Sequence, residues 1–204
     1  MTSFVFDLET TGLNPFHDDI IEVAIKKLNT DNIFHSYVKP TKTFDGKFVP
    51  NIITNITKIT HEMISELGIS QFMLCQYLFR FINNHSIKNE YIYLIAHNGI
   101  SFDMLFLHNL LKKFINNIPN NKKTYYINIY NKIRCIDTLL LSKLLLPNIK
   151  SYSQCNLCNI YKIQQINPHS AFGDINDLEK VYNNLIKNID NKKSENIYNL
   201  YNTL

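Results

Sequence analysis

Apolar residues at the start of the chain gather in short runs that are separated by polar, turn-forming residues. Residues 3–6 are mostly apolar and β-prone, and the apolar segments 20–28 and 33–38 follow with turn-like residues between them. Short runs rich in Ile, Val and Phe between turns are typical of hairpin-connected strands. The pattern therefore predicts a meander of three strands.

Farther along the chain, the hydrophobic spacing alternates between helical and strand-like. Apolar residues recur at helical spacing over 69–83, and the nearly continuous apolar run at 91–96 is typical of a buried strand. An amphipathic helix is predicted from Ser101 onward. The remaining predicted elements are one strand and three helices, at 132–136, 137–145, 151–161 and 173–189.

The predicted order is strands, helix, strand, helix, strand and helices. This order favours an α/β fold in which a mixed sheet carries helices on its faces. No internal repeat and no linker rich in Pro, Gly or Ser divides the 204 residues. A chain of this length suits one sizeable core, so a single domain is expected.

Composition narrows the class of protein. No apolar run approaches the roughly 18 residues that a membrane-spanning helix requires. The N-terminus shows no basic head before an apolar stretch, so no secretory signal is expected. Four cysteines without a secretory context favour reduced thiols. We therefore expect an intracellular, non-secreted protein with no membrane partner.

The charge balance is mildly basic. The formal net charge of +4 and the pI of 8.7 are compatible with a polyanionic partner. Only Arg80 and Arg134 are arginines among 21 basic residues. Because proteins that read base edges rely on the arginine fork, a nucleic acid partner is expected to be held through backbone charge and shape.

The first block with candidate chemistry is FDLETTG at 6–12. Asp7 and Glu9 are separated by one residue, so an extended chain points both side chains to the same face. Two carboxylates this close repel each other unless a cation neutralises them. Taken alone, the block is better explained as a strand that ends in a polar turn.

Two further polar blocks lie at the predicted boundaries of strands and helices. AHNGISFD ends a buried strand and places Asp103 at the start of a helix, and HSAFGD places His169 five residues before Asp174 at the start of the last helix. Each aspartate alone is explained as a helix cap. Together, the three blocks supply four carboxylates and one histidine, as a two-metal phosphodiester hydrolase requires.

The chemistry of this set is consistent with such an enzyme. Carboxylate oxygens suit Mg²⁺ or Mn²⁺, and the cations are needed because four negative charges would repel a phosphate. A neutral imidazole nearby can accept a proton from water near pH 7.

These blocks resemble the three motifs of the DEDDh family of 3′-to-5′ exonucleases, which includes polymerase proofreading subunits and ribonuclease T. FDLETTGL is similar to the first motif, AHNGISFD to the second and HSAFGD to the third. The five-residue step from His169 to Asp174 is that of the histidine subfamily. The likeness runs from Phe4 to Ile189. It implies a ribonuclease H-like fold with a mixed five-stranded sheet and helices on both faces, an exonuclease domain over 1–189 and a short C-terminal tail over 190–204.

The resemblance also implies a role for each residue of the set. Asp7, Glu9 and Asp174 would hold one Mg²⁺ or Mn²⁺ ion, and Asp7 with Asp103 would help to hold a second. His169 would be the general base. The product would be a nucleoside 5′-monophosphate released from the 3′ end.

A further group would surround the terminal nucleotide. The substrate-binding residues implied by the resemblance are Thr10, Thr11, Gly12, Leu13, Asn98 and Phe102. Leu13 would lie against the terminal base. Phe102 either offers a stacking face or fills the core beneath the helix. Asn98 either bonds the substrate or caps the turn.

The expected function is that of a metal-dependent 3′-to-5′ exonuclease acting on single-stranded or frayed DNA or RNA 3′ ends. Two alternatives stay open: an RNA-specific trimming exoribonuclease, and a non-catalytic adaptor with the exonuclease fold. The adaptor is disfavoured because no metal carboxylate of the motifs is missing. The domain is expected either to act alone or to work with a polymerase in trans.

Overall fold

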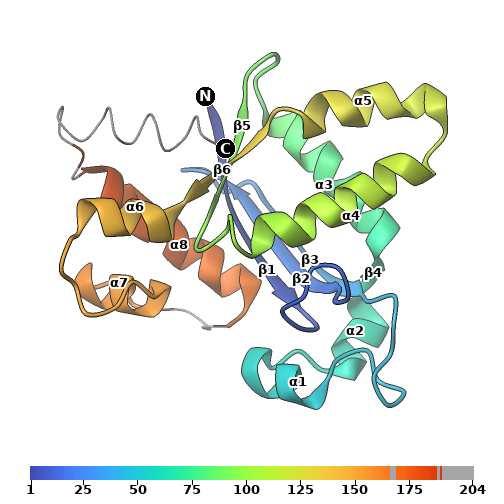
Figure 1. Ribbon diagram of the computed structural model, residues 1–204, viewed down its shortest axis with the longest axis horizontal. Helices are drawn as coiled ribbons and strands as arrows, with labels where there is room; N and C mark the ends of the chain where they lie inside the picture. The colour runs from blue at the N-terminus through green and yellow to red at the C-terminus, as the bar shows by residue number, and fades with distance from the viewer. Residues whose placement is uncertain (166–168, 188, 190–204) are drawn as a thin grey trace.

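A mixed six-stranded sheet forms the centre of the molecule (Figure 1). The computed structural model describes residues 1–165, 169–187 and 189. The strands, in the order β4-β3-β2-β1-β5-β6, are β1 (Thr2–Thr10), β2 (Ile20–Lys27), β3 (Ile33–Lys39), β4 (Ile69–Ser70), β5 (Ile92–Ala96) and β6 (Ile133–Asp137). β1, β2 and β3 form the predicted antiparallel meander, whereas β5 and β6 run parallel to β1.

The sixth strand, β4, corrects the expected count of five. Ile69 and Ser70, which the hydrophobic spacing assigns to the start of a helix, pair in parallel with the end of β3. The helix begins at Gln71 instead, because the Ser70 side chain accepts a hydrogen bond from the backbone N of Met73 and so caps the first turn. The other five strands lie where the sequence predicts them.

Eight helices lie in the described part of the chain. They are α1 (Asn51–Thr57), α2 (His61–Leu67), α3 (Gln71–His85), α4 (Asp103–Asn117), α5 (Asn120–Tyr130), α6 (Thr138–Leu145), α7 (Gln154–Ile160) and α8 (Ala171–Lys187). The predicted helices correspond to α3, α4, α6, α7 and α8, whereas α1, α2 and α5 are not predicted. The expected C-terminal tail, 190–204, lies outside the described residues.

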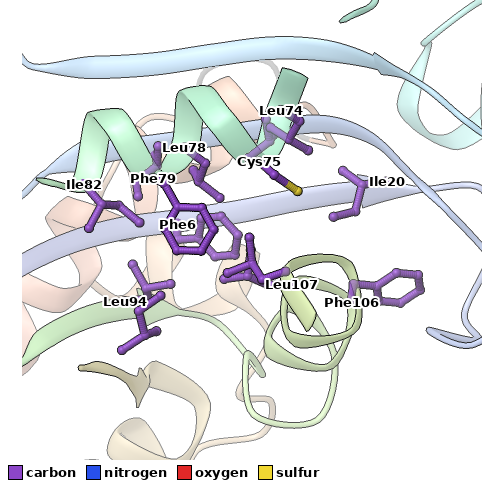
Figure 2. Packing of buried hydrophobic residues seen from close by; sticks show 14 of the residues in the cluster. Phe6, Ile20, Leu74, Cys75, Leu78, Phe79, Ile82, Leu94, Phe106 and Leu107 are labelled. Atoms are coloured by element: carbon purple, nitrogen blue, oxygen red, sulfur yellow. The ribbon is translucent and has the colours of Figure 1, made fainter. Parts of the chain in front are cut away.

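Helices cover both faces of the sheet, as the sequence predicts (Figure 1). Phe4, Phe6 and Leu8 of β1 pack into the larger core with α3, α4 and α5, and Figure 2 shows Phe6 beside side chains of α3 and α4. Val5, on the opposite face of the same strand, packs with α6, α7 and α8. Because successive residues of a strand point to opposite faces, β1 separates two cores.

The segment that contains α1 and α2 adds a small third core beside the sheet. Ile21 of β2 packs there with Val49, Ile59 and Ile64.

In the described part of the chain, every helix is too short or too polar to cross a membrane.

Candidate active site

Three of the predicted ligands converge on the α8 side of the sheet. Asp7 and Glu9 alternate along β1 with the buried Phe6 and Leu8, so they share the face of β1 on which α8 packs. Asp174 stands in the first turn of α8. One carboxylate oxygen from each of the three acids lies within 4.8 Å of the others. The structure thus brings the first and third sequence blocks together.

Asp103 joins the second block to this site. It is the first residue of α4 and is buried, and its Oδ1 accepts a hydrogen bond of 3.2 Å from the backbone N of Leu8. Asp103 is not part of the group of three, but it is the nearby charge that raises the pKa of Asp7 most. It therefore lies beside Asp7 at the start of α4.

Burial raises the pKa of all four carboxyl groups, and repulsion from nearby acids adds to the effect. The pKa of Asp7 rises well above its usual range, first because of burial and then because of neighbouring carboxylates. Burial, followed by repulsion from other acids, raises the pKa of Glu9 to about 8. Burial also raises the pKa of Asp103 to about 7 and that of Asp174 to about 6. The charged form of this set is therefore costly without a cation.

The described residues supply no Lys or Arg to neutralise these four acids. Their lysine ion pairs with carboxylates involve Glu179 and Asp177 instead. Closely spaced oxygen donors with unbalanced negative charge fit divalent Mg²⁺ or Mn²⁺. The site is therefore chemically suited to the predicted metal ions.

His169 is linked directly to the acidic group. Its backbone N donates a hydrogen bond of 3.2 Å to Oδ2 of Asp174, and its φ of 65° places it in the left-handed region. The same histidine lowers the pKa of Asp174, partly offsetting the effect of burial. The histidine is exposed, so solvent and ligands can reach it. Residues 166–168 lie outside the described residues.

The loop after β1 has a fixed shape. Oγ1 of Thr10 donates to the Gly12 carbonyl at 2.6 Å, and Oγ1 of Thr11 donates to Oδ1 of Asp18 at 3.2 Å. A Cβ on Gly12 would lie only 2.5 Å from Asp18 Oδ2, so any other residue would displace the Asp18 carboxylate from its bonds to Thr11 and Asn14. Both threonine hydroxyls thus bond within the loop, whereas Leu13 is 84% exposed. Of these four predicted residues, Leu13 has the side chain most available to a ligand.

The remaining two predicted substrate residues lie in the turn that precedes α4. Asn98 has a φ of 59°, and its backbone N donates to Oδ1 of Asp137 at 3.1 Å. Oδ2 of Asp137 accepts from the backbone N of Ile100, also at 3.1 Å. Phe102 is half-buried and packs on Phe106, with ring centroids 5.0 Å apart. Asp137, which the sequence analysis does not select, therefore fixes the turn that carries Asn98.

Glu22 is a second residue that the three sequence motifs do not indicate. It is 1% exposed and stands opposite Glu9 in the register of β1 and β2. Burial is the first cause of the raised pKa of Glu9, and Glu22 is the next. The available signal was a single acid inside the apolar run IIEVAI.

Comparison with solved structures places the fold in a known class. Exonuclease I of E. coli in complex with a dT13 oligonucleotide matches with a TM-score of 0.71 and 16% identity, over 98% of this chain and 43% of that chain. A second exonuclease I structure matches with a TM-score of 0.70 and 17% identity, over 91% of this chain and 40% of that chain. The protein has the ribonuclease H-like α/β fold that the sequence implies.

Sequence comparison then gives the family. A family model described as "Exonuclease" matches residues 4–182, so the chain belongs to this exonuclease family. The epsilon subunit of DNA polymerase III from Buchnera aphidicola subsp. Baizongia pistaciae is 33% identical over 190 residues, which are 87% of this chain and 68% of the relative. The resemblance recognised in the three motifs is confirmed, and the chain is a nuclease by family.

Another group of relatives consists of much longer proteins. The PolC-type DNA polymerase III of Mycoplasma genitalium is 34% identical over 186 residues, which are 89% of this chain but 11% of that protein. The corresponding protein of Mycoplasma pneumoniae is 31% identical over 183 residues, again 89% of this chain and 11% of the relative. The chain thus spans about a tenth of the length of these polymerases.

Proposed function

We propose that this protein is a metal-dependent 3′-to-5′ exonuclease that releases nucleoside 5′-monophosphates from single-stranded or frayed nucleic acid. The observation that carries the proposal is the convergence of Asp7, Glu9 and Asp174 to within 4.8 Å, although they come from opposite ends of the chain. Membership of the exonuclease family supports the same reaction class. We further propose that the catalytic domain spans 1–189.

Two divalent ions, Mg²⁺ or Mn²⁺, complete the proposed site. Asp7, Glu9 and Asp174 would hold one ion, and Asp7 with Asp103 would help to hold the other. When bound, such ions stabilise the negative charge that develops on the phosphate and on the leaving oxygen. The carboxylates that would bind these ions are held in position by β1, α4 and α8.

The other residues of the site handle the proton and the substrate. We assign the imidazole of His169 as the general base that takes a proton from the attacking water, a role that suits its exposure and its link to Asp174. Leu13 is assigned to the terminal base. We assign to the 3′ end of the nucleic acid the backbone of 10–12 together with Asn98 and Phe102. Packing on Phe106 limits how much of the Phe102 ring can stack on a base.

DNA is the substrate that the comparisons favour. Two sets of relatives are DNA polymerase III proteins, and the exonuclease I structure holds a dT13 oligonucleotide. We therefore propose that the chain trims DNA 3′ ends, alone or with a polymerase in trans. RNA trimming is the competing assignment. The adaptor is not favoured, because all four carboxylates are present at the site.

A degradation assay tests these assignments together. A 5′-labelled oligonucleotide is incubated with Mg²⁺ or Mn²⁺ as single-stranded DNA, as duplex DNA with a 3′ mismatch, and as RNA. We expect a ladder of 3′-shortened products, fastest on single-stranded DNA. Asp7→Ala should lower the rate by at least about 100-fold, because even the partners of metal ligands contribute 10–100-fold.

Asp31→Ala serves as the matched control, since Asp31 is an exposed acid in the turn between β2 and β3. It should cleave at the wild-type rate. No 3′ shortening with either metal on any substrate would rule out the proposed activity. Faster cleavage of RNA than of DNA would reassign the substrate.

A further inference from the structure

Glu22 places a fifth carboxylate beside the acidic group without an evident catalytic reason. It lies on β2 opposite Glu9, and it adds to the charge repulsion that raises the pKa of Asp7, Glu9 and Asp174. It is not part of the group of oxygens that lies within 4.8 Å. A buried charge in such surroundings is retained only where strong hydrogen bonds compensate for it.

Both carboxylate oxygens of Glu22 have such bonds. Oε2 accepts a hydrogen bond of 3.0 Å from the backbone N of Ala171, the first residue of α8. Oε1 lies 2.7 Å from Nε2 of His35 on β3 and 3.5 Å from Oγ of Ser170. The first amides of a helix have no partner inside the helix, and an anion at this end also complements the helix dipole. Glu22 therefore caps α8 from a different element.

His35 strengthens the same attachment through ring contacts. Its imidazole lies 5.4 Å from the ring of Phe172, measured between centroids, and the ring of Tyr37 lies 5.4 Å away from it in an edge arrangement. Residues 170–172 are thus held by β2 through Glu22 and by β3 through His35. This segment lies directly between His169 and Asp174.

We propose that Glu22 is a positioning residue of the nuclease site. Together with His35, it fixes the start of α8 on the sheet. His169 and Asp174 flank the fixed segment, so their placement relative to β1 depends on these contacts. A misplacement of about 1 Å can cost on the order of 100-fold in rate. The inference rests on the proposed function, because it assigns Glu22 to the same reaction.

Two variants separate positioning from charge. Glu22→Ala removes both acceptor oxygens, whereas Glu22→Gln keeps one acceptor for the Ala171 amide and removes the charge. With 5′-labelled single-stranded DNA at saturating Mg²⁺, we expect Glu22→Ala to lower kcat by at least about 10-fold, with KM changed less than about twofold. Glu22→Gln should recover most of the lost kcat. Melting curves identify any variant that fails to fold.

A second measurement needs no activity. Hydrogen exchange of peptides at the start of α8 should accelerate at least about 10-fold in Glu22→Ala, while peptides around Val181 and Leu185 keep their protection. If the wild type cleaves nothing, the proposed function fails, but this exchange pattern still tests the attachment of α8. If Glu22→Ala does not fold, His35→Ala takes its place in both measurements, with the same direction expected.

Three outcomes would overturn the inference. The first is an alanine variant with the wild-type kcat, and the second is a glutamine variant as slow as the alanine variant. The third is unchanged exchange at the start of α8 in both Glu22→Ala and His35→Ala.

Discussion

Asp7 is buried among neighbouring carboxylates, and its pKa is raised by that burial and by their charge. Asp7→Asn keeps the shape of the side chain and removes the charge. We expect the metal-free variant to be more stable than the wild type by about 1 kcal/mol or more, because on folding the wild-type carboxyl group either takes up a proton or keeps a charge that its neighbours repel, and asparagine does neither. Nuclease activity should be lost as well. Urea unfolding in EDTA measures this difference.

Asp31→Asn is the control for the removal of a negative charge, because this residue is exposed. It should change the free energy of unfolding by less than about 0.5 kcal/mol. An Asp7→Asn protein less stable than the wild type in EDTA would contradict the account of repulsion.

Glu9 links the stability of the metal-free protein to pH. Burial and neighbouring charges raise its pKa from 4.5 to about 8, so the folded state holds this proton more tightly than the unfolded state does. Its contribution to stability is complete below about pH 4.5 and is lost as pH rises through about 8. We therefore expect the free energy of unfolding in EDTA to fall between pH 5.5 and about pH 8.5. Urea titrations across this range measure the slope.

Glu9→Gln should make that slope shallower, because the variant has no proton to release at this position. The rest of the slope should remain, since the pKa values of Asp7, Asp103 and Asp174 are also raised. Saturating Mg²⁺ should flatten the wild-type slope as well, since a bound cation favours the ionised carboxylate. A slope of the opposite sign in the wild type would show that the carboxyl group is not held in its protonated form.

At the scale of single residues, the sequence predicts the acids of the site better than it predicts the contacts that position them. Asp7, Glu9 and Asp174 stand in motifs with fixed spacing, and the structure brings them together. Glu22 bonds the amide of Ala171, 149 residues away in the sequence, and nothing in local spacing indicates that contact. Tertiary hydrogen bonds of this kind become visible only in the folded chain.

At the scale of elements, the loop from Thr11 to Asp19 forms a closed unit next to the acids. The backbone N of Thr11 donates to the carbonyl of Asp19 at 2.9 Å, which closes the neck of the loop and leaves Leu13 exposed. Because the chain has no tryptophan, Leu13→Trp introduces a single tryptophan at the proposed terminal-base contact. We expect its fluorescence to be quenched when single-stranded DNA is added to a Leu13→Trp protein that also carries Asp7→Asn.

Ile87→Trp is the matched control for that experiment. Ile87 is 57% exposed, and its backbone N bonds the side chain of Thr2 at the beginning of β1, the end of the strand opposite to the acids. Its fluorescence should not respond to the oligonucleotide. Equal quenching at both positions would indicate nonspecific binding and would remove the assignment of Leu13.

The residue that follows α1 has a strained backbone conformation. Lys58 adopts a left-handed conformation with φ 64°, at a helix C-terminus where glycine is the usual residue. A non-glycine residue in this region costs roughly 1–2 kcal/mol. Lys58→Gly should therefore raise the free energy of unfolding by about 0.5–1 kcal/mol, after the added freedom of glycine in the unfolded chain is subtracted.

Lys58→Ala is the control for this prediction, because alanine keeps the Cβ and the strain. It should bring no gain in a urea titration. Equal stabilisation by both substitutions would point to the loss of the lysine charge as the cause.

The sequence predicts those helices that are stabilised by an apolar face of their own, and it misses helices that are stabilised mainly by tertiary contacts. α3, α4 and α8 carry apolar stripes that face a core, so their spacing reveals them. α5 has little amphipathic pattern, and Tyr126 anchors it through ring contacts of 4.9 Å with both Phe79 and Phe114. Such packing, and the pairing of β4 with the end of β3, come from the tertiary structure and not from local sequence.

For the whole molecule, the proposed ligands join three elements across both faces of the sheet. β1 provides Asp7 and Glu9, α4 provides Asp103, and α8 provides Asp174. An ion that binds these elements binds the folded chain and not the unfolded chain. Mn²⁺ at 100 times its Kd should therefore add about 2.7 kcal/mol to the free energy of unfolding. Thermal melting with and without Mn²⁺ measures this gain.

Asp174→Asn should lose most of that gain, whereas the surface variant Asp31→Asn should retain it. An equal shift of the melting temperature in all three proteins would mean that the ion binds elsewhere.

The acids of the site also become available at different times during synthesis. A ribosome makes a chain from its N-terminus, so Asp7, Glu9 and Asp103 emerge well before Asp174 and the helix that carries it. Until α8 has left the ribosome and docked on β1, the growing chain has an incomplete acidic cluster. A nascent chain that still lacks α8 therefore cannot assemble the group of Asp7, Glu9 and Asp174, and the proposed activity would begin only after α8 has docked.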